Sequence, residues 1–190
     1  MENVINDNFN RQRLSTFFHA DNSIKGSIDR NICDLIVLIN SLSDYYTTSS
    51  CSGRISITNN SSGKQGRLIN SYHDPTPSDK IIEELVTDGD FSISFEPFIL
   101  HIQCRNLEKA SQLLSVVLNE GFKNSGLVIG KSKKINLAIR NTSSIHVPLN
   151  YQLVSNEYVK YIVDILNEAL KKNNDKLYKF TKFLTDYYNK

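Results

Sequence analysis

Apolar residues recur at helical spacing in four stretches of the chain, and each stretch begins beside a residue that commonly caps helices. Gly121 is suited to end the third helix, and a weaker pattern predicts a further helix over 8–18. Asn173 and Asn174 are expected to interrupt the last helix before a second apolar set at 177–187. The four predicted helices follow Ser27 as far as residue 42, run from Ser78 to 85, follow Asn106 as far as 118 and follow Ser155 as far as 170.

Runs typical of strands lie between these helices, over 54–58, 91–104, 127–130 and 135–140. Helical and strand segments do not alternate as regularly as in a doubly wound parallel sheet. The order therefore predicts an α+β fold with a mixed, largely antiparallel sheet flanked by helices. No linker divides the chain, so we expect a single domain over 1–190 whose C-terminal helices start at about 156.

The composition is that of an ordinary globular protein, with 190 residues of which 39% are hydrophobic and 22% charged. Its three cysteines have no metal-ligand spacing, and their odd number argues against a disulfide framework, so a reducing compartment fits best. No apolar run approaches the roughly 18 residues that span a bilayer. We therefore expect a soluble, intracellular protein with no membrane or metal partner.

Charge is distributed unevenly along the chain. Residues 45–73 and 121–156 contain no acidic residue and together carry a charge of +8, whereas the whole chain carries +2. A polyanion such as RNA would prefer these segments if they meet in space. The alternative is that both segments are loop-rich and lack acidic residues by accident.

Two blocks in the first third of the chain combine polar side chains with glycine. In SIKGSIDR, residues 23–30, a glycine turn precedes a predicted helix start, where Lys25 and the helix N-terminus would attract an anion. In YYTTSSCSGR, residues 45–54, the hydroxyls are suited to hydrogen bonding, Tyr45 and Tyr46 to stacking on a nucleobase, and Arg54 to gripping a phosphate. By composition alone, a Ser/Thr-rich turn before the strand at 54–58 explains the second block equally well.

Two later blocks carry the remaining candidates. FEPFILHIQCR, residues 95–105, places Glu96 and His101 in an apolar strand, on opposite faces by strict alternation, although Pro97 is able to bulge the strand and change this phase. GFKNSGLVIGKSKK, residues 121–134, offers glycines and lysines as a cradle for a ligand or an RNA backbone, or forms a hairpin with a solvated lysine turn. No Rossmann, P-loop, HExxH or zinc motif accompanies them.

Taken together, KGSID, YYTTSSCSGRI, FEPFILHIQCR, GFKNSGLVIGK, AIRNT and VPL resemble, in this order, the tRNA wybutosine-synthesizing protein 3 family. These blocks lie between Ser23 and Leu149, and the helical tail from Ser155 is similar too. The resemblance implies a methyltransferase, not of the Rossmann type, that uses S-adenosylmethionine to methylate a ring nitrogen of the wybutosine precursor. This tricyclic base lies beside the anticodon of phenylalanine tRNA. Family members usually carry a tryptophan where this chain has Leu68, whereas His73 matches.

On this interpretation, three groups of residues form the site. The candidates for accepting the proton or facing the sulfonium are Asp29, Glu96 and His101. The sequence does not rank these three residues. Cofactor contacts are assigned to Ser50, Cys51, Ser52, Gly53, Ser125 and Gly126. Contacts to tRNA are assigned to Lys25, Tyr45, Tyr46, Arg54, His73, Lys123, Lys131, Lys133 and Arg140.

Two other interpretations stay open. A noncatalytic RNA-binding module would use the same basic segments and aromatic side chains without chemistry, and binding of S-adenosylmethionine would distinguish the two. Cys51 would be a covalent nucleophile only with a base beside it and a stabilised thiolate. A small, inert thiol is the simpler role for that residue.

Overall fold

A computed structural model describes residues 2–16, 26–60, 66–85, 89–130, 132–150 and 152–189 of the protein. Its architecture is α+β, as predicted, and every pairing with a defined register is antiparallel. Among the described residues, no helix has the length and apolar character needed to cross a bilayer. The helices are α1 (Glu2–Thr16), η1 (Arg30–Ile32, a 3-10 turn), α2 (Cys33–Ser41), α3 (Ser78–Glu84), α4 (Leu107–Asn119) and α5 (Asn156–Tyr188). The strands are β1 (Tyr45–Asn59), β2 (Arg67–Tyr72), β3 (Asp90–Cys104), β4 (Gly126–Ile129), β5 (Ile135–Arg140) and β6 (Ile145–Asn150).

The strands form one sheet in the order β2-β1-β3-β5-β4, with β6 paired to β3. The chain divides into two compact units. The first unit comprises Met1–Ser52, Phe98–Thr142 and Leu177–Lys190, and the second comprises Gly53–Pro97 and Ser143–Lys176. Each of β1, β3 and α5 therefore contributes residues to both units. Whether 1–190 behaves as a single domain stays a prediction.

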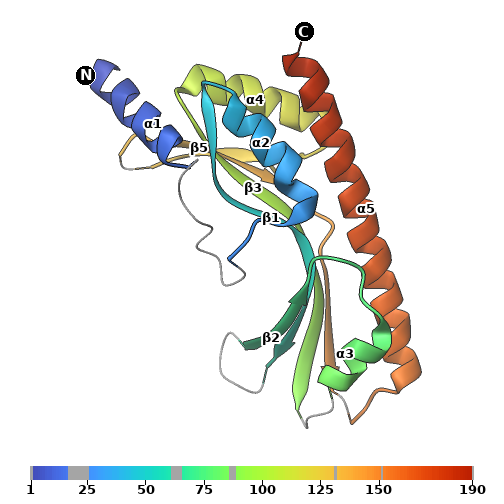
Figure 1. Ribbon diagram of the computed structural model, residues 1–190. Coiled ribbons are helices and arrows are strands. Elements are labelled where there is room, and N and C mark those ends of the chain that lie inside the picture. The colour runs from blue at the N-terminus through green and yellow to red at the C-terminus, as the bar shows by residue number, and fades with distance from the viewer. Residues whose placement is uncertain are drawn as a thin grey trace. The chain divides into compact units, whose positions relative to one another are not determined.

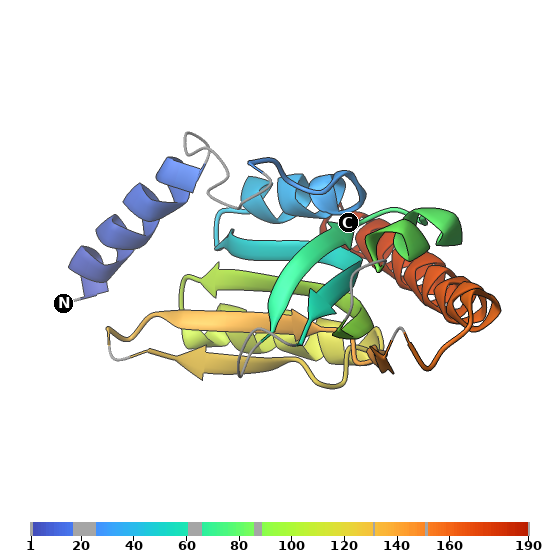
Figure 2. The ribbon, with the colours of Figure 1, turned by 90° about the horizontal axis from the view of Figure 1, so that it is seen from below.

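In the first unit, helices cover one face of the sheet. Apolar side chains of α2, α4 and the C-terminal part of α5 pack with those of β3 and β5 into one buried cluster (Figure 1). Leu35, Leu113 and Leu177 represent the three helices, and each is fully buried. The hairpin of β4 and β5 lies beside β3 (Figure 2). This packing leaves the opposite face of these strands for polar side chains.

In the second unit, α3 and the N-terminal part of α5 supply the apolar cover. Ile81, Val159 and Val163 are fully buried with Ile55 of β1 and Phe91 of β3. β2 pairs with β1 and β6 pairs with β3, both in antiparallel register. Neither β2 nor β6 was predicted from the sequence, because their short apolar patterns are interrupted by polar residues and by Pro148.

Strand β3 changes its buried face in the middle. Phe91, Ile93 and Phe95 are buried before Pro97, whereas Phe98 and Leu100 are buried after it. Proline has no N–H for the ladder, and the strand changes partner at the same place, from β6 for residues 90–95 to β5 for residues 99–104. Strict alternation therefore does not hold along β3, and the alternative that Pro97 changes the phase describes the strand.

The predicted helix ends are partly confirmed. Asn106 caps α4 by accepting a hydrogen bond from the Lys109 N–H at 2.9 Å, and Gly121 follows that helix at a φ of 85°. Ser155 Oγ accepts from the Tyr158 N–H at 3.2 Å at the start of α5. These polar side chains satisfy backbone groups that the first and last turns leave without helical partners.

Two helix predictions are wrong. α5 continues through Asn173 without the expected break, because an interior asparagine costs only about 0.5 kcal/mol relative to alanine and the buried Leu170 and Leu177 continue the apolar stripe on both sides. Ser27 does not start a helix, since α2 begins only at Cys33 after the 3-10 turn. The carboxylate of Asp29, which precedes that turn, is bound to strand β1 instead.

Strand β1 is longer than predicted. It begins at Tyr45, so the Ser/Thr-rich run is a strand and not a turn before 54–58. Strand propensity at serine is low, and the tertiary hydrogen bonds described below outweigh it.

We predict that Asn106→Ala lowers the free energy of unfolding by about 1 kcal/mol, because the first turn of α4 loses its side-chain acceptor. The matched control is Asn119→Ala at the exposed end of the same helix, which should change stability by less than about 0.5 kcal/mol. Urea unfolding followed by circular dichroism measures both. Equal losses for the two variants would contradict the capping role.

Candidate active site

Strand β1 holds the carboxylate of Asp29 in the first unit. Asp29 Oδ2 accepts from the Ser52 N–H at 2.9 Å and from the Ser52 hydroxyl at 3.2 Å. Asp29 is 8% exposed and Ser52 is fully buried. Donors directed at a carboxylate favour its charged form and fix its orientation. Ser52, predicted as a cofactor contact, therefore has its hydroxyl engaged in positioning Asp29.

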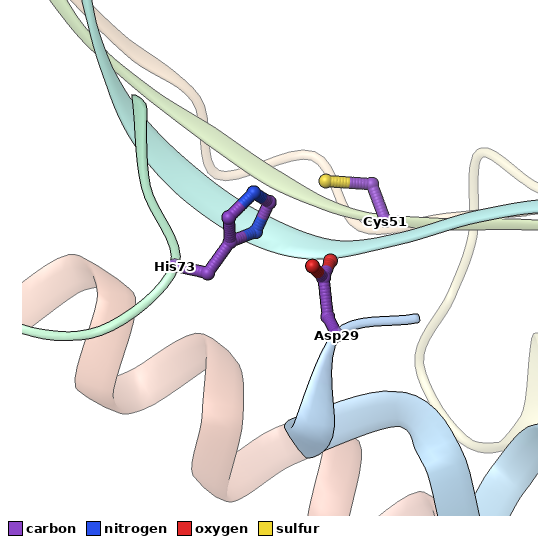
Figure 3. A group of neighbouring side chains, drawn as sticks. All are labelled: Asp29, Cys51 and His73. Atoms are coloured by element: carbon purple, nitrogen blue, oxygen red, sulfur yellow. The ribbon is translucent and has the colours of Figure 1, made fainter. Parts of the chain in front are cut away.

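The thiol of Cys51 lies beside this carboxylate. A carboxylate oxygen of Asp29 and Cys51 Sγ are within 4.8 Å of each other, and Figure 3 shows the two side chains approaching from different elements. Cys33, Cys51 and Cys104 form no disulfide, and burial raises the pKa of Cys104 to about 12. The role of Cys51 stays a prediction.

His101 forms a second polar pair with strand β1. Its Nδ1 lies 2.7 Å from Ser49 Oγ, and its carbonyl oxygen accepts from the Thr48 hydroxyl at 3.3 Å. Burial, and then the positive charge of Arg140, lower the pKa of His101 below its ordinary value. The imidazole is therefore neutral at neutral pH and able to accept a proton.

The register across β3, β5 and β4 aligns small residues with His101. His101 pairs with Ala138, and Ala138 pairs with Gly126 on its other side. A Cβ added at Gly126 would meet no atom within 4 Å. Two positions along β3 and β5, on the same face of the sheet, Ile99 pairs with Arg140, and the Arg140 N–H donates to Ser125 Oγ at 3.1 Å. Ser125 thus fixes the backbone of β5, whereas Gly126 leaves open space.

The second unit contains an ion pair that sequence reasoning assigned differently. Arg54 donates to Glu96 Oε2 from Nε at 3.0 Å and from Nη2 at 2.8 Å. Glu96 Oε1 accepts from the hydroxyl of Ser56 at 2.7 Å. Both carboxylate oxygens of Glu96 are engaged, and Arg54 already binds a carboxylate, so Arg54 is not a simple phosphate clamp.

His73 also belongs to the second unit and is labelled in Figure 3. Its Nδ1 lies 3.1 Å from the carbonyl oxygen of Gly53. Gly53 has a φ of 101°, a conformation that favours glycine over residues with a side chain. The backbone conformation at this position therefore favours glycine, and the carbonyl of Gly53 positions the ring of His73.

The stacking role predicted for Tyr45 and Tyr46 does not fit the structure. Each residue is 4% exposed. The Tyr45 hydroxyl donates to the Lys109 carbonyl at 3.0 Å, and the Tyr46 hydroxyl donates to Gln12 Oε1 at 2.9 Å. Burial raises the pKa of both phenols. Neither ring presents a face to a nucleobase, because both complete the apolar packing around α1, α4 and α5.

The exposed cations of the first unit remain suited to RNA. Lys123 follows α4, Lys133 lies between β4 and β5, and Arg140 ends β5. Ser50 of the hydroxyl run is also exposed. Lys25 and Lys131, the other predicted cationic contacts, lie outside the described residues. The hairpin expected around the lysines of this block is confirmed, with Lys133 at a φ of 60°.

Two serines contact candidate site residues, and the sequence did not indicate these contacts. Ser49 contacts His101 across 52 positions of chain, and Ser56 contacts Glu96 across 40. No local pattern distinguishes these serines from their neighbours. Only the pairing of β1 with β3 shows which hydroxyl meets which ionisable side chain.

Comparison with known proteins defines the class. Residues 10–186 match the family model described as "Methyltransferase TYW3". The antiparallel pairings separate this methyltransferase fold from the doubly wound Rossmann type. The chain belongs to the TYW3 methyltransferase family.

Relatives in animals and archaea support this assignment. The chain is 36% identical to the mouse tRNA wybutosine-synthesizing protein 3 homolog over 93% of this chain and 72% of that protein. It is 35% identical over 88% of its length, and over 84% of the relative, to the Pyrococcus abyssi tRNA(Phe) 7-((3-amino-3-carboxypropyl)-4-demethylwyosine(37)-N(4))-methyltransferase 2. The solved structure of the PH1069 protein from Pyrococcus horikoshii superposes with a TM-score of 0.81 at 28% identity, covering 96% of this chain and 97% of that one.

We predict that Arg140→Gln raises the pKa of His101, because it removes the cation that disfavours the imidazolium. The matched control is Lys179→Gln on the exposed side of α5, which should leave that pKa unchanged. Titration of the imidazole C–H resonances by NMR, assigned with a His101→Gln variant, measures the pKa. An unchanged midpoint in Arg140→Gln would show that burial alone depresses it.

Proposed function

We propose that this protein transfers a methyl group from S-adenosylmethionine to a ring nitrogen of the wybutosine precursor next to the anticodon of phenylalanine tRNA. The observation that carries the proposal is the family match over residues 10–186, which includes Asp29, Cys51 and His101. The name of the Pyrococcus abyssi relative gives the substrate in detail, a 4-demethylwyosine that bears a 3-amino-3-carboxypropyl group and is methylated on N4. The substrate tRNA is consistent with a cytoplasmic protein.

The residues present fit the proposed methyl donor. S-adenosylmethionine, when bound, supplies an electrophilic methyl group on a positively charged sulfur. Asp29 offers a nearly buried carboxylate of complementary charge. Among the predicted cofactor contacts, Ser50 is exposed and Gly126 has open space where a side chain would lie. The expectation that no metal takes part stays a prediction.

Two side chains of the first unit have complementary roles in this proposal. Asp29, held by both donors of Ser52, stabilises positive charge at a fixed place. His101, which is neutral and oriented by Ser49, accepts the proton that the ring nitrogen loses. Glu96 takes no proton in this proposal, which assigns that role to His101, because Arg54 and Ser56 bind both oxygens of the glutamate.

Exposed cations supply the affinity for RNA in this proposal. Lys123, Lys133 and Arg140 are exposed, and none of them is ion-paired with another residue in the part of the chain that the structure describes. Contacts of lysine and arginine with phosphates fix the position of the RNA without reading its bases. Recognition of the modified base therefore falls to the polar side chains on the strands.

The proposed function is tested by methyl transfer from labelled S-adenosylmethionine to phenylalanine tRNA from cells that lack this step. We expect label on the precursor tRNA and none on fully modified tRNA, because the target nitrogen is already methylated there. Mass spectrometry of the nuclease digest locates the added methyl group on the base. Binding of the precursor tRNA without any label would favour the noncatalytic RNA-binding module.

We predict that Asp29→Asn lowers kcat/KM by roughly 100-fold, because the bound cation loses a complementary charge in the ground state and in the transition state. The matched control is Asp34→Asn at the exposed start of α2, which should keep kcat/KM within about twofold. Thermal unfolding of each variant shows whether the fold survives the change. A folded Asp29→Asn protein with unchanged kcat/KM would remove this carboxylate from the mechanism.

A further inference from the structure

We propose that Arg54 and Glu96 together recognise a 3-amino-3-carboxypropyl group, the amino-acid end that both S-adenosylmethionine and the proposed substrate base carry. This inference rests on the proposed function. The group is a zwitterion at neutral pH, with one carboxylate and one ammonium. The bound group belongs either to the cofactor or to the substrate base, and the experiment below separates these two sources.

The ion pair is partly open to solvent. The side chains of Arg54 and Glu96 are 33% and 45% exposed, although Arg54 places two nitrogens against one carboxylate oxygen. A guanidinium has five N–H donors in all, and a carboxylate accepts about four hydrogen bonds. The contacts seen use two donors of Arg54 and leave it able to bind a second carboxylate.

Ser56 fixes the position of the Glu96 carboxylate. Its hydroxyl is 2% exposed and donates to Glu96 Oε1 at 2.7 Å. The hydroxyl of Ser56 therefore keeps one oxygen of the glutamate bound to β1 even when its arginine partner moves. A partly exposed ion pair contributes little to stability, typically below about 1 kcal/mol, so exchanging a partner for a ligand group costs little.

The presence of both charges selects the kind of ligand. A phosphate would gain from Arg54 but would be repelled by Glu96 next to it. A zwitterion satisfies both residues, because its carboxylate binds the planar guanidinium in bidentate fashion and its ammonium binds Glu96. The pair is thus better matched to an amino acid than to the RNA backbone to which Arg54 was assigned from the sequence.

The position of Arg54 in the chain agrees with this role. It follows Gly53 on β1, the strand that also carries the hydroxyl run. His73 binds the carbonyl of Gly53, which fixes the backbone immediately before Arg54. The arginine therefore projects from a backbone position that has little freedom.

The test uses Arg54→Gln in the full chain, with Arg67→Gln on the exposed part of β2 as the matched control. The first measurement is calorimetric binding of S-adenosylhomocysteine and of 5′-methylthioadenosine, which lacks the aminocarboxypropyl group. The second is kcat/KM on precursor tRNA with and without that group on its base. Arg67→Gln should change neither the preference for S-adenosylhomocysteine over 5′-methylthioadenosine nor the preference for tRNA that carries the group.

If the cofactor is the source, the wild-type protein binds S-adenosylhomocysteine at least tenfold more tightly, and Arg54→Gln reduces this ratio to near one. If the base is the source, the cofactor ratio survives and the preference for the substituted tRNA is lost. The inference is overturned if both preferences survive in Arg54→Gln or if the wild-type protein has neither. A wild-type protein that prefers S-adenosylhomocysteine yet methylates neither tRNA would refute the proposed function and leave the binding result standing.

A second variant tests whether the ion pair between Arg54 and Glu96 acts only by stabilising the fold. Arg54→Glu combined with Glu96→Arg restores an ion pair with its charges exchanged, while Ser56 stays in place. We expect this double variant to unfold at nearly the wild-type temperature but to lack the preference that Arg54→Gln loses. Recovery of that preference would show that the pair only holds the strands together.

Discussion

A proline in the middle of β3 determines which side chains of that strand are available for chemistry. Pro97 cannot donate to the ladder, and the buried positions change from odd to even numbers across it. Glu96 before the proline and His101 after it are therefore both half-buried, each directed away from the apolar core of its own unit. Strict alternation would have placed one of them in a core, where an ionisable group needs a compensating partner.

The hydroxyls of β1 have a common role that their composition did not indicate. Ser49 binds His101, Ser52 binds Asp29 and Ser56 binds Glu96. Hydrogen bonds of this kind restrict the rotamers of all three side chains, and those to the carboxylates of Asp29 and Glu96 belong to the stronger class, worth about 1.5–3 kcal/mol when the acceptor is charged. The strand thus orients three titratable groups before any ligand arrives, which is the condition for catalysis by positioning.

Elements with local signals were predictable, and contacts between distant residues were not. The capping side chain of Asn106 and the glycine that follows α4 both lie within the helix signal itself, and Pro97 carries its own backbone restriction. Asn173 shows the limit of propensity, since burial of leucines on both sides of it keeps α5 intact. The burial of Tyr45 and Tyr46 depends on α4 and α1, which no pattern near residue 45 indicates. For the same reason Asp29, His101 and Glu96 could be named but not assigned roles.

Exposed cations and precisely held polar side chains occupy different elements of the protein. This arrangement explains how a protein with a net charge of only +2 can act on a polyanion. Exposed lysines such as Lys133 contribute long-range attraction that salt weakens, and their side chains need no fixed orientation. Methyl transfer, in contrast, requires groups held within a fraction of an ångström, and strands provide such precision better than loops do. The candidate residues Asp29 and His101 are bound to β1, whereas the exposed cations proposed to bind RNA occupy a hairpin turn and strand ends. Arg140 connects the two sets, because its charge also lowers the pKa of His101, so a mutation of Lys133 separates RNA affinity from chemistry better than a mutation of Arg140.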